Sequence, residues 1–297
     1  MAGGCATLLN GWWIREELAA GIDLAGCALV LADEPRVARL TGSDCGAAVI
    51  GIAHGDPGSG LDAVLGDADL ARLPRPCPED LATILFTSGS TSQSKAAFSD
   101  HRGVVQAALN YALQSAAMAQ ILLETGDPPA SVQASLLSVP MFHITGEVPL
   151  LLQSFAIGRK LVAMAKWDVP EAMRLIEQER VTYFIGVPLM SHEIATHPER
   201  DRFDLSSCRS FAAGGAPRPP EHVALLRKAL PKGYPLIGYG LTETNGVGCI
   251  NVEGNYLAKP GSTGPATAPL SEVMIAGPEG RALPQGEVGE VAIRSIC

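Results

Sequence analysis

Short apolar runs rich in aliphatic and β-branched residues alternate along this chain with stretches of helical periodicity. Such alternation is typical of βαβ units, in which successive strands lie parallel in one sheet and helices cover its faces. The sequence therefore predicts an α/β fold built on stacked βαβ sheets. The predicted strands cover residues 28–32, 47–52, 82–86, 134–139, 160–164, 182–187, 209–213 and 236–239.

Helix start signals support this reading. Asp168, Pro170 and Glu171 precede an apolar periodic stretch, which predicts a helix over 168–180. Further helices are expected over about 101–121 and 220–230. After Lys259, Gly- and Pro-rich turns flank short strands at 272–275 and 288–294, which predict a small antiparallel unit. We therefore expect two βαβ subdomains within 1–260, divided near residue 160, and the start of a β subdomain at 261–297.

Composition excludes several classes of protein. The 297 residues are 47% hydrophobic and 18% charged, so a disordered chain is not expected. The net charge of −9 and the absence of a Lys/Arg block argue against nucleic acid as a partner. No apolar run approaches the roughly 20 residues of a membrane span, and no leader precedes Arg15, so we expect a cytoplasmic protein. Seven scattered cysteines without a CxxC pair predict neither disulfides nor zinc, and each is expected to be a small buried apolar residue.

One polar segment directly follows the apolar strand predicted at 82–86. It is rich in hydroxyl residues and contains Gly89 and Lys95. Hydroxyls, backbone amides and a lysine ammonium suit the oxygens of a polyphosphate. The segment is not a Walker A loop, because no glycine precedes Lys95 and Ala96 follows it. By composition alone, an ordinary polar surface loop is an equal alternative.

This segment resembles the phosphate loop of the adenylate-forming superfamily, which reads Thr-Ser-Gly-Ser-Thr-Gly-x-Pro-Lys-Gly. That superfamily contains AMP-forming acyl-CoA synthetases, luciferases and nonribosomal adenylation domains. Ser92, Ser94 and Ala96 stand where the family has Gly, Pro and Gly. The resemblance assigns phosphate binding to the residues that match, which are Thr87, Ser88, Gly89, Ser90, Thr91 and Lys95.

Further segments follow in the order of the family. Residues 140–146, with His143, resemble its Pro-Leu-Phe-His-x-x-Gly segment between the nucleotide and acyl sites, although a lone histidine there is more often structural. Residues 182–188 resemble the strand-to-helix turn that lines the acid pocket. The resemblance assigns the adenine-binding turn to Gly214, Gly215, Ala216 and Pro217.

Residues 238–244 are similar to the family's Tyr-Gly-x-Thr-Glu motif, which is the most specific of the set. Tyr239 and Gly240 are assigned to the nucleotide, Thr242 to phosphate or carboxylate, and Glu243 to Mg²⁺. Residues 261–264 and 286–291 resemble structural turns of the same family.

The resemblance implies ATP-dependent activation of a carboxylic acid as acyl-AMP, followed by transfer to coenzyme A, with Mg²⁺ as cofactor. The expected catalytic residues are Lys95, His143, Thr242 and Glu243. No aspartate stands in 142–147 to bind a substrate ammonium, which favours a plain fatty or aryl acid, and Glu147 is expected to be a solvated helix cap. An acyl- or nucleotide-binding module without catalysis is the alternative.

The family pattern extends past both ends of this chain. The expectation is therefore a large N-terminal domain of the adenylate-forming fold without the C-terminal small domain. Such a chain is expected to be weak or inactive by itself, and its exposed edges could promote self-association.

Overall fold

The computed structural model describes residues 3–53, 73–87 and 94–297, which form two compact units, Met1–His101 and Arg102–Cys297. The phosphate-loop residues Ser88, Gly89, Ser90 and Thr91 lie outside the described residues. The predicted division near residue 160 stays a prediction. Each unit is described by itself.

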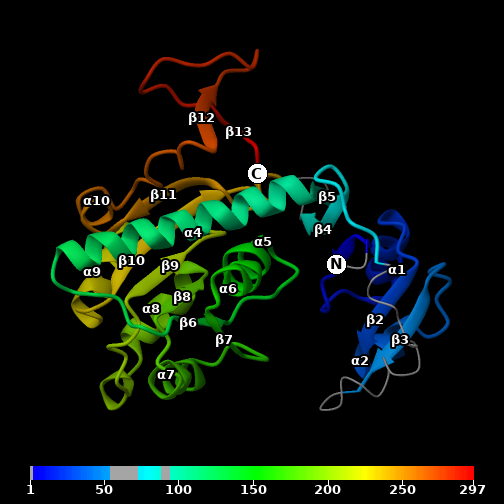
Figure 1. Ribbon diagram of the computed structural model, residues 1–297, viewed down its shortest axis with the longest axis horizontal. Helices are drawn as coiled ribbons and strands as arrows, with labels where there is room; N and C mark the ends of the chain where they lie inside the picture. Colours follow the sequence, from blue (N-terminus) through cyan, green and yellow to red (C-terminus); the bar gives the residue numbers. More distant parts are fainter. Residues whose placement is uncertain (1–2, 54–72, 88–93) are drawn as a thin grey trace. The chain divides into compact units, whose positions relative to one another are not determined.

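The smaller unit contains two small sheets (Figure 1). Strands β1 (Ala6–Leu8), β4 (Leu81–Thr87) and β5 (Lys95–Asp100) form one sheet in the order β1-β4-β5, and β2 (Leu29–Asp33) pairs in parallel with β3 (Ala48–Ile52). Helices α1 (Arg15–Leu24) and α2 (Glu34–Leu40) accompany the second sheet. Asp33 caps α2 by accepting a hydrogen bond from the Arg36 amide, which explains why the strand turns directly into a helix. The core of the unit contains Leu18, Ile22, Val30, Ala32 and Leu40.

The larger unit is built on one six-stranded sheet in the order β11-β10-β9-β8-β6-β7. Only the pair of β10 with β11 is antiparallel. This sheet confirms the predicted α/β fold class. Its strands are β6 (Ala134–Leu137), β7 (Lys160–Ala163), β8 (Tyr183–Gly186), β9 (Ser210–Ala213), β10 (Tyr234–Gly240) and β11 (Gly248–Val252).

Helices cover both faces of this sheet. The long helix α4 (His101–Glu124) runs across the strands in Figure 1, and the three predicted helices are found as α4, α7 (Val169–Gln178) and α9 (Pro220–Ala229). Asp168 caps α7 by accepting a hydrogen bond from the Glu171 amide at 2.9 Å, as its sequence position predicts. The remaining helical segments are α5 (Ile144–Gly146), the π-helical η2 (Glu147–Leu152), α6 (Gln153–Ile157), α8 (Pro188–Thr196), α10 (Glu253–Ala258) and the short turns η3 (Arg200–Arg202) and η4 (Thr242–Thr244).

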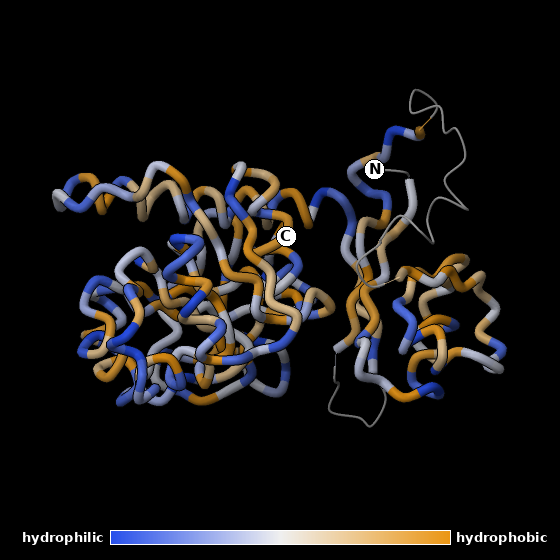
Figure 2. Tube along the Cα trace, turned by 90° about the horizontal axis from the view of Figure 1, so that it is seen from below, coloured by the Kyte–Doolittle hydropathy of each residue, from blue (hydrophilic) through white to orange (hydrophobic). Residues whose placement is uncertain are grey.

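Successive residues of the central strands point to opposite faces, and both faces are buried. One face packs with α7, α8 and α9 around Leu136, Phe184 and Phe211. The other face carries Leu137 and Ile185 among its buried residues. Figure 2 shows hydrophilic segments in several of the connecting turns of this unit. A sheet covered on both sides explains why its strands appear in the sequence as continuous apolar runs.

The last strands, β12 (Ser271–Ala276) and β13 (Glu290–Ser295), pair antiparallel and confirm the small antiparallel unit predicted after Lys259. Two expectations about single residues are wrong. Glu147 is only 5% exposed, because it begins η2 in a run of buried residues, so it is not a solvated cap. Cys5 and Cys77 are exposed, since they lie in chain segments outside the packed helices and strands. Among the described residues, no helix has the length and apolar character that a bilayer span requires.

Candidate functional site

Two of the segments singled out in the sequence meet at one edge of the larger sheet. Strands β9 and β10 are parallel neighbours, with Ala213 opposite Ile237, so the residues that follow them leave the sheet at the same edge. The Gly214 amide also donates to the Gly186 carbonyl of β8 at 3.2 Å. The carboxyl edge of a parallel sheet is where α/β proteins bind ligands. Gly214 and Gly215 thus lie with Gly238 and Gly240 in the wall of one cavity. The other predicted residues of these two segments do not line that cavity, and they are Ala216, Pro217, Tyr239, Thr242 and Glu243.

At this edge of the sheet, three glycines present backbone that no side chain covers. These residues are Gly214, Gly215 and Gly238, and we call them the glycine surface. A Cβ at Gly215 or Gly238 would meet no atom within 4 Å, and one at Gly214 would meet only the Gly238 carbonyl at 3.6 Å. The space is therefore open and not filled by protein. Gly215 has a φ of +74°, which favours glycine. A flat ring could lie against this surface, which fits the predicted adenine-binding turn.

The turn after β10 is held by a side chain that the sequence motif did not single out. The buried Thr244 hydroxyl accepts a hydrogen bond from the Leu241 amide at 3.2 Å and donates one to the Val247 carbonyl at 2.6 Å. A Cβ at Gly240 would collide with the Gly246 carbonyl, so Gly240 permits a close backbone approach. A hydroxyl residue within a turn is the only sequence signal that could have pointed to Thr244.

The residues assigned to phosphate and cation lie in this turn. Thr242 and Glu243 belong to η4, and the Glu243 side chain is exposed. In the described part of the chain, no group of three or more His, Cys, Asp or Glu side chains is arranged so that it could hold a metal ion. Mg²⁺ characteristically takes one or two carboxylates and completes its shell with water and substrate phosphates. An exposed single carboxylate such as that of Glu243 fits that mode of binding.

His143 lies in a tight turn of the larger unit. The His143 amide donates to the Pro140 carbonyl at 3.1 Å, and a Cβ at Gly146 would collide with the same carbonyl. The imidazole is exposed and packs on the Phe142 ring, with 4.8 Å between centroids. The residues that follow, Ile144 and Thr145, line the cavity described next, whereas His143 does not.

Thr87 and Lys95 belong to the smaller unit. They face each other at the end of the antiparallel pair of β4 and β5, and the Thr87 hydroxyl donates to the Lys95 carbonyl at 3.5 Å. The Lys95 side chain is exposed. The register places both residues at the ends of the segment 88–94 that they enclose.

A cavity of about 110 Å³ adjoins the glycine surface, and we call it the α4 cavity because α4 supplies part of its wall. Its wall also includes α5, η2 and the four strands β8 to β11. Most of its side chains are apolar. The lining residues are Tyr111, Gln114, Ile144, Thr145, Pro149, Tyr183, Ile185, Ala213, Gly214, Gly215, Leu236, Gly238, Gly240, Gly246, Val247, Gly248, Cys249, Ile250 and Thr267.

Two tyrosines that the sequence analysis did not identify contribute to this wall. Burial raises the pKa of Tyr111, and the nearby Tyr183 phenol raises it further. Burial also raises the pKa of Tyr183, although the Arg159 guanidinium acts in the opposite direction. Both side chains are therefore neutral phenols at physiological pH and can donate a hydrogen bond. Tyr111, on α4, lies outside every motif and gave no sequence signal, whereas Tyr183, on β8, lies within the segment 182–188 that the resemblance places at the acid pocket.

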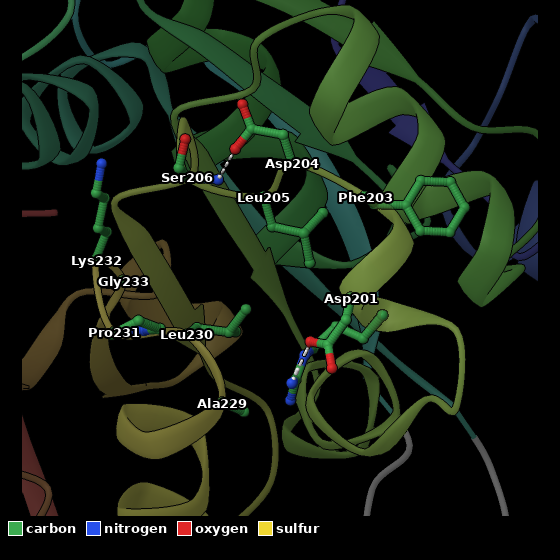
Figure 3. Close-up of a pocket in the computed structure, with 11 residues that line it drawn as sticks. Asp201, Phe203, Asp204, Leu205, Ser206, Ala229, Leu230, Pro231, Lys232 and Gly233 are labelled. Carbon is green, nitrogen blue, oxygen red and sulfur yellow. Dashed lines mark hydrogen bonds and ion pairs between the residues drawn. The ribbon is translucent and has the colours of Figure 1, made fainter.

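A second cavity of about 220 Å³ opens at the amino ends of β9 and β10 (Figure 3). Its polar side chains are largely engaged with each other and with nearby backbone. Asp204 accepts from the Ser206 amide at 3.0 Å, and Asp201 pairs with Arg200. None of the predicted site residues lines it, so the α4 cavity is the candidate site.

Comparison with known proteins assigns the chain to a family. The chain matches the family model described as AMP-binding enzyme over residues 1–297. Among curated relatives, feruloyl-CoA synthase from Amycolatopsis sp is 32% identical over 217 residues, which is 72% of this chain and 41% of the relative. The 4-coumarate-CoA ligase 1 from Narcissus pseudonarcissus is 29% identical over 304 residues, 99% of this chain and 54% of the relative. The chain thus spans about half, or less, of the length of these relatives.

Solved structures of several related proteins have the same fold as this chain. The inhibitor-bound N-terminal domain of FACL13 from Mycobacterium tuberculosis superimposes with a TM-score of 0.80 at 26% identity, covering 98% of this chain and 70% of that one. The ATP-bound MatB from Rhodopseudomonas palustris has a TM-score of 0.80 at 23% identity, over 99% of this chain and 56% of that one, and supports the fold alone. This chain therefore belongs to the AMP-binding enzyme family and has the fold of the N-terminal domain of adenylate-forming acyl-CoA synthetases.

Proposed function

We propose that this chain binds Mg·ATP and a carboxylic acid, and carries the nucleotide and acid sites of a ligase that forms acyl-CoA through acyl-AMP. The observation that carries the proposal is the glycine surface, which is open to a flat ring and continuous with the largely apolar α4 cavity. A nucleotide on the first and an acid in the second would bring a carboxylate near an α-phosphate. The names of the CoA-ligase relatives agree with this chemistry.

In the proposed reaction, a carboxylate oxygen attacks the α-phosphorus of ATP, an acyl–phosphate bond forms, and pyrophosphate leaves with the electron pair of the α–β anhydride. The coenzyme A thiolate then attacks the acyl carbon and AMP leaves. Such a phosphoryl centre demands charge neutralisation more than a general base. We assign Lys95 to the departing phosphates, Thr242 to phosphate or carboxylate oxygens, and His143 to the junction of the acid and nucleotide.

Glu243 would hold the Mg²⁺, which supplies positive charge to the phosphate oxygens when it is bound. The exposure of this carboxylate in η4 supports the assignment. Thr87 and the hydroxyl residues after it are assigned to the phosphates on sequence grounds.

The size of the α4 cavity favours a small acid. An engineered cavity of about 150 Å³ binds benzene, whereas the α4 cavity measures about 110 Å³. We therefore favour an aryl acid with one ring over a long fatty acid. The acids in the names of the feruloyl-CoA and 4-coumarate-CoA relatives also contain one ring.

AMP binding by two glycine-to-valine variants tests the proposal. Gly238→Val would place a side chain on the glycine surface at a position where the added Cβ meets no atom within 4 Å, so we expect calorimetry to show at least a tenfold loss of AMP affinity. Gly254→Val is the matched control, because its Cβ also meets no atom within 4 Å but lies in α10, away from the cavity. Equal AMP binding by both variants and the wild type would contradict the proposed nucleotide site.

A binding module without catalysis is the second candidate, favoured by Ser92, Ser94 and Ala96 in place of the family's Gly, Pro and Gly. Measuring pyrophosphate after addition of ATP and acid distinguishes the ligase from the binding module, because the module would bind both ligands without releasing pyrophosphate.

Self-association also stays a proposal. The exposed Phe98 on β5 and Phe155 on α6 would support it, and analytical ultracentrifugation would test it.

A further inference from the structure

The wall of the α4 cavity contains two tyrosine side chains, Tyr111 and Tyr183. Neither the Tyr111 nor the Tyr183 hydroxyl has a hydrogen-bond partner among the described residues, although both side chains line the cavity. Both tyrosines are half-buried, and neither hydroxyl is among the buried atoms of the described residues that lack a partner. The hydroxyls are therefore open to the cavity, where a polar group of a bound ligand could replace water as their partner.

The Tyr111 hydroxyl is held at one defined point of the wall. It lies 2.8 Å from the position that a Cβ on Gly246 would take, and Gly246 has a φ of +76°. The body of the ring packs against the buried cluster of Ala107, Val148 and Val247. The absence of a side chain at Gly246 is therefore what gives the hydroxyl its place.

Tyr183 is fixed by a different set of contacts. It begins β8 and shares a face with Ile185, so its side chain stands on the cavity side of the sheet. The guanidinium of Arg159 lies 5.0 Å from the centre of its ring. Arg159 is itself buried and donates to the Pro149 carbonyl at 2.9 Å and to Ser154 at 3.1 Å.

We propose that Tyr111 and Tyr183 determine acid specificity by hydrogen bonding to an oxygen substituent on the ring of the bound acid. This inference rests on the proposed function and adds the substrate class of its acid site. The surrounding wall of Ile144, Ile185, Leu236 and Val247 offers a ring only apolar contact. Because a phenol can both donate and accept, the pair can bind a ring hydroxyl and can also donate to an ether oxygen.

Calorimetric titration of the full 297-residue chain with two matched acids tests the inference. The acids are 3-phenylpropenoic acid and its 4-hydroxy derivative, each in the presence of saturating AMP. We expect the wild type to bind the hydroxylated acid roughly two- to tenfold more tightly, which corresponds to one net hydrogen bond. Tyr111→Phe and Tyr183→Phe should each reduce this ratio, and the double variant should bring it close to one, while affinity for the unsubstituted acid changes little.

Tyr234→Phe is the matched control. It removes a hydroxyl that donates to Asp127 at 3.3 Å, and Tyr234 does not line the cavity. Its ratio should equal that of the wild type. The two cavity variants are made separately, so that one tests the inference even if the other fails to fold.

Equal affinity of the wild type for both acids would overturn the inference, as would a ratio that survives in the double variant. Binding of AMP with neither acid would also overturn it while leaving the nucleotide site in place. Failure to bind both AMP and acid would contradict the proposed function itself, so the two failures are distinguishable.

Discussion

At the scale of single residues, the candidate site of this chain depends on glycines as well as on charged side chains. Gly215 adopts a positive φ, Gly238 leaves open space, and Gly240 allows two backbone segments to approach closely. Any other residue would fill or strain these positions. The charged candidates Lys95 and Glu243 are exposed, and the roles that we propose for them concern bound ligands.

Lys95→Ala is expected to weaken the binding of ATP roughly tenfold or more and to change AMP binding by less than about twofold. The reason is that a charge-assisted hydrogen bond is worth about 1.5–3 kcal/mol, and we assign this lysine to the phosphates that AMP lacks. Calorimetry with both nucleotides measures the difference. Lys228→Ala, at an exposed position in the last turn of α9, is the control. An equal loss for ATP and AMP would remove Lys95 from this role.

At the scale of elements, the turn between β10 and β11 is shaped by Thr244. Thr244→Val removes a hydroxyl that bonds both to Leu241 and to Val247, and leaves a buried carbonyl without that donor. We expect a loss of about 1–3 kcal/mol in the free energy of unfolding, together with weaker AMP binding. Urea unfolding and calorimetry provide the two readouts.

Thr196→Val is the control for this change. The Thr196 hydroxyl donates to the His192 carbonyl from an exposed position at the end of α8, so its loss should cost little. Equal unfolding free energies for the two variants would show that Thr244 does not fix the turn.

The contact between α8 and α9 is predicted to weaken in acid. The rings of His192 and His222 stack with 4.0 Å between centroids, and both Nδ1 atoms are buried without a partner among the described residues. Burial lowers the pKa of His222 below 6.5, the His192 and Arg218 charges lower it further, and Glu221 opposes them. The unfolded chain therefore binds more protons than the folded one as pH falls below 6.5. The contribution of His222 to stability is present above that pH and is lost below it.

Urea unfolding followed by circular dichroism at pH 8 and at pH 5.5 measures this effect. His222→Gln should make the free energy of unfolding less dependent on pH over that interval. His197→Gln leaves the stacked pair intact and should keep the wild-type dependence. An unchanged pH dependence in His222→Gln would contradict the prediction.

At the scale of the whole molecule, AMP binding is expected to protect the larger unit more than the smaller one. The described wall of the α4 cavity and the glycine surface belong to the unit Arg102–Cys297. AMP at about 100 times its dissociation constant should add about 2.7 kcal/mol to the stability of the state that binds it. Hydrogen exchange should show protection at 214–217 and 238–248. Thermal unfolding should show a higher midpoint when AMP is present. Protection limited to the smaller unit would contradict this assignment.

The sequence by itself determined the fold class and most of the larger unit. Apolar strands such as 182–187 and helix signals such as Asp168 are local, and a parallel sheet buried on both faces makes them easy to recognise. The ordered motifs at 87–95, 214–217 and 239–243 also identified the family that the comparisons confirm. These features depend on neighbouring residues, so a single sequence contains them.

The tertiary structure alone decided which side chains share a cavity. Tyr111 and Tyr183 are 72 positions apart and come together only because α4 crosses the face of the sheet that β8 belongs to. The burial of Glu147 likewise depends on packing of η2, which residue order does not reveal. Contacts between distant segments follow from how elements pack, and no local pattern encodes them.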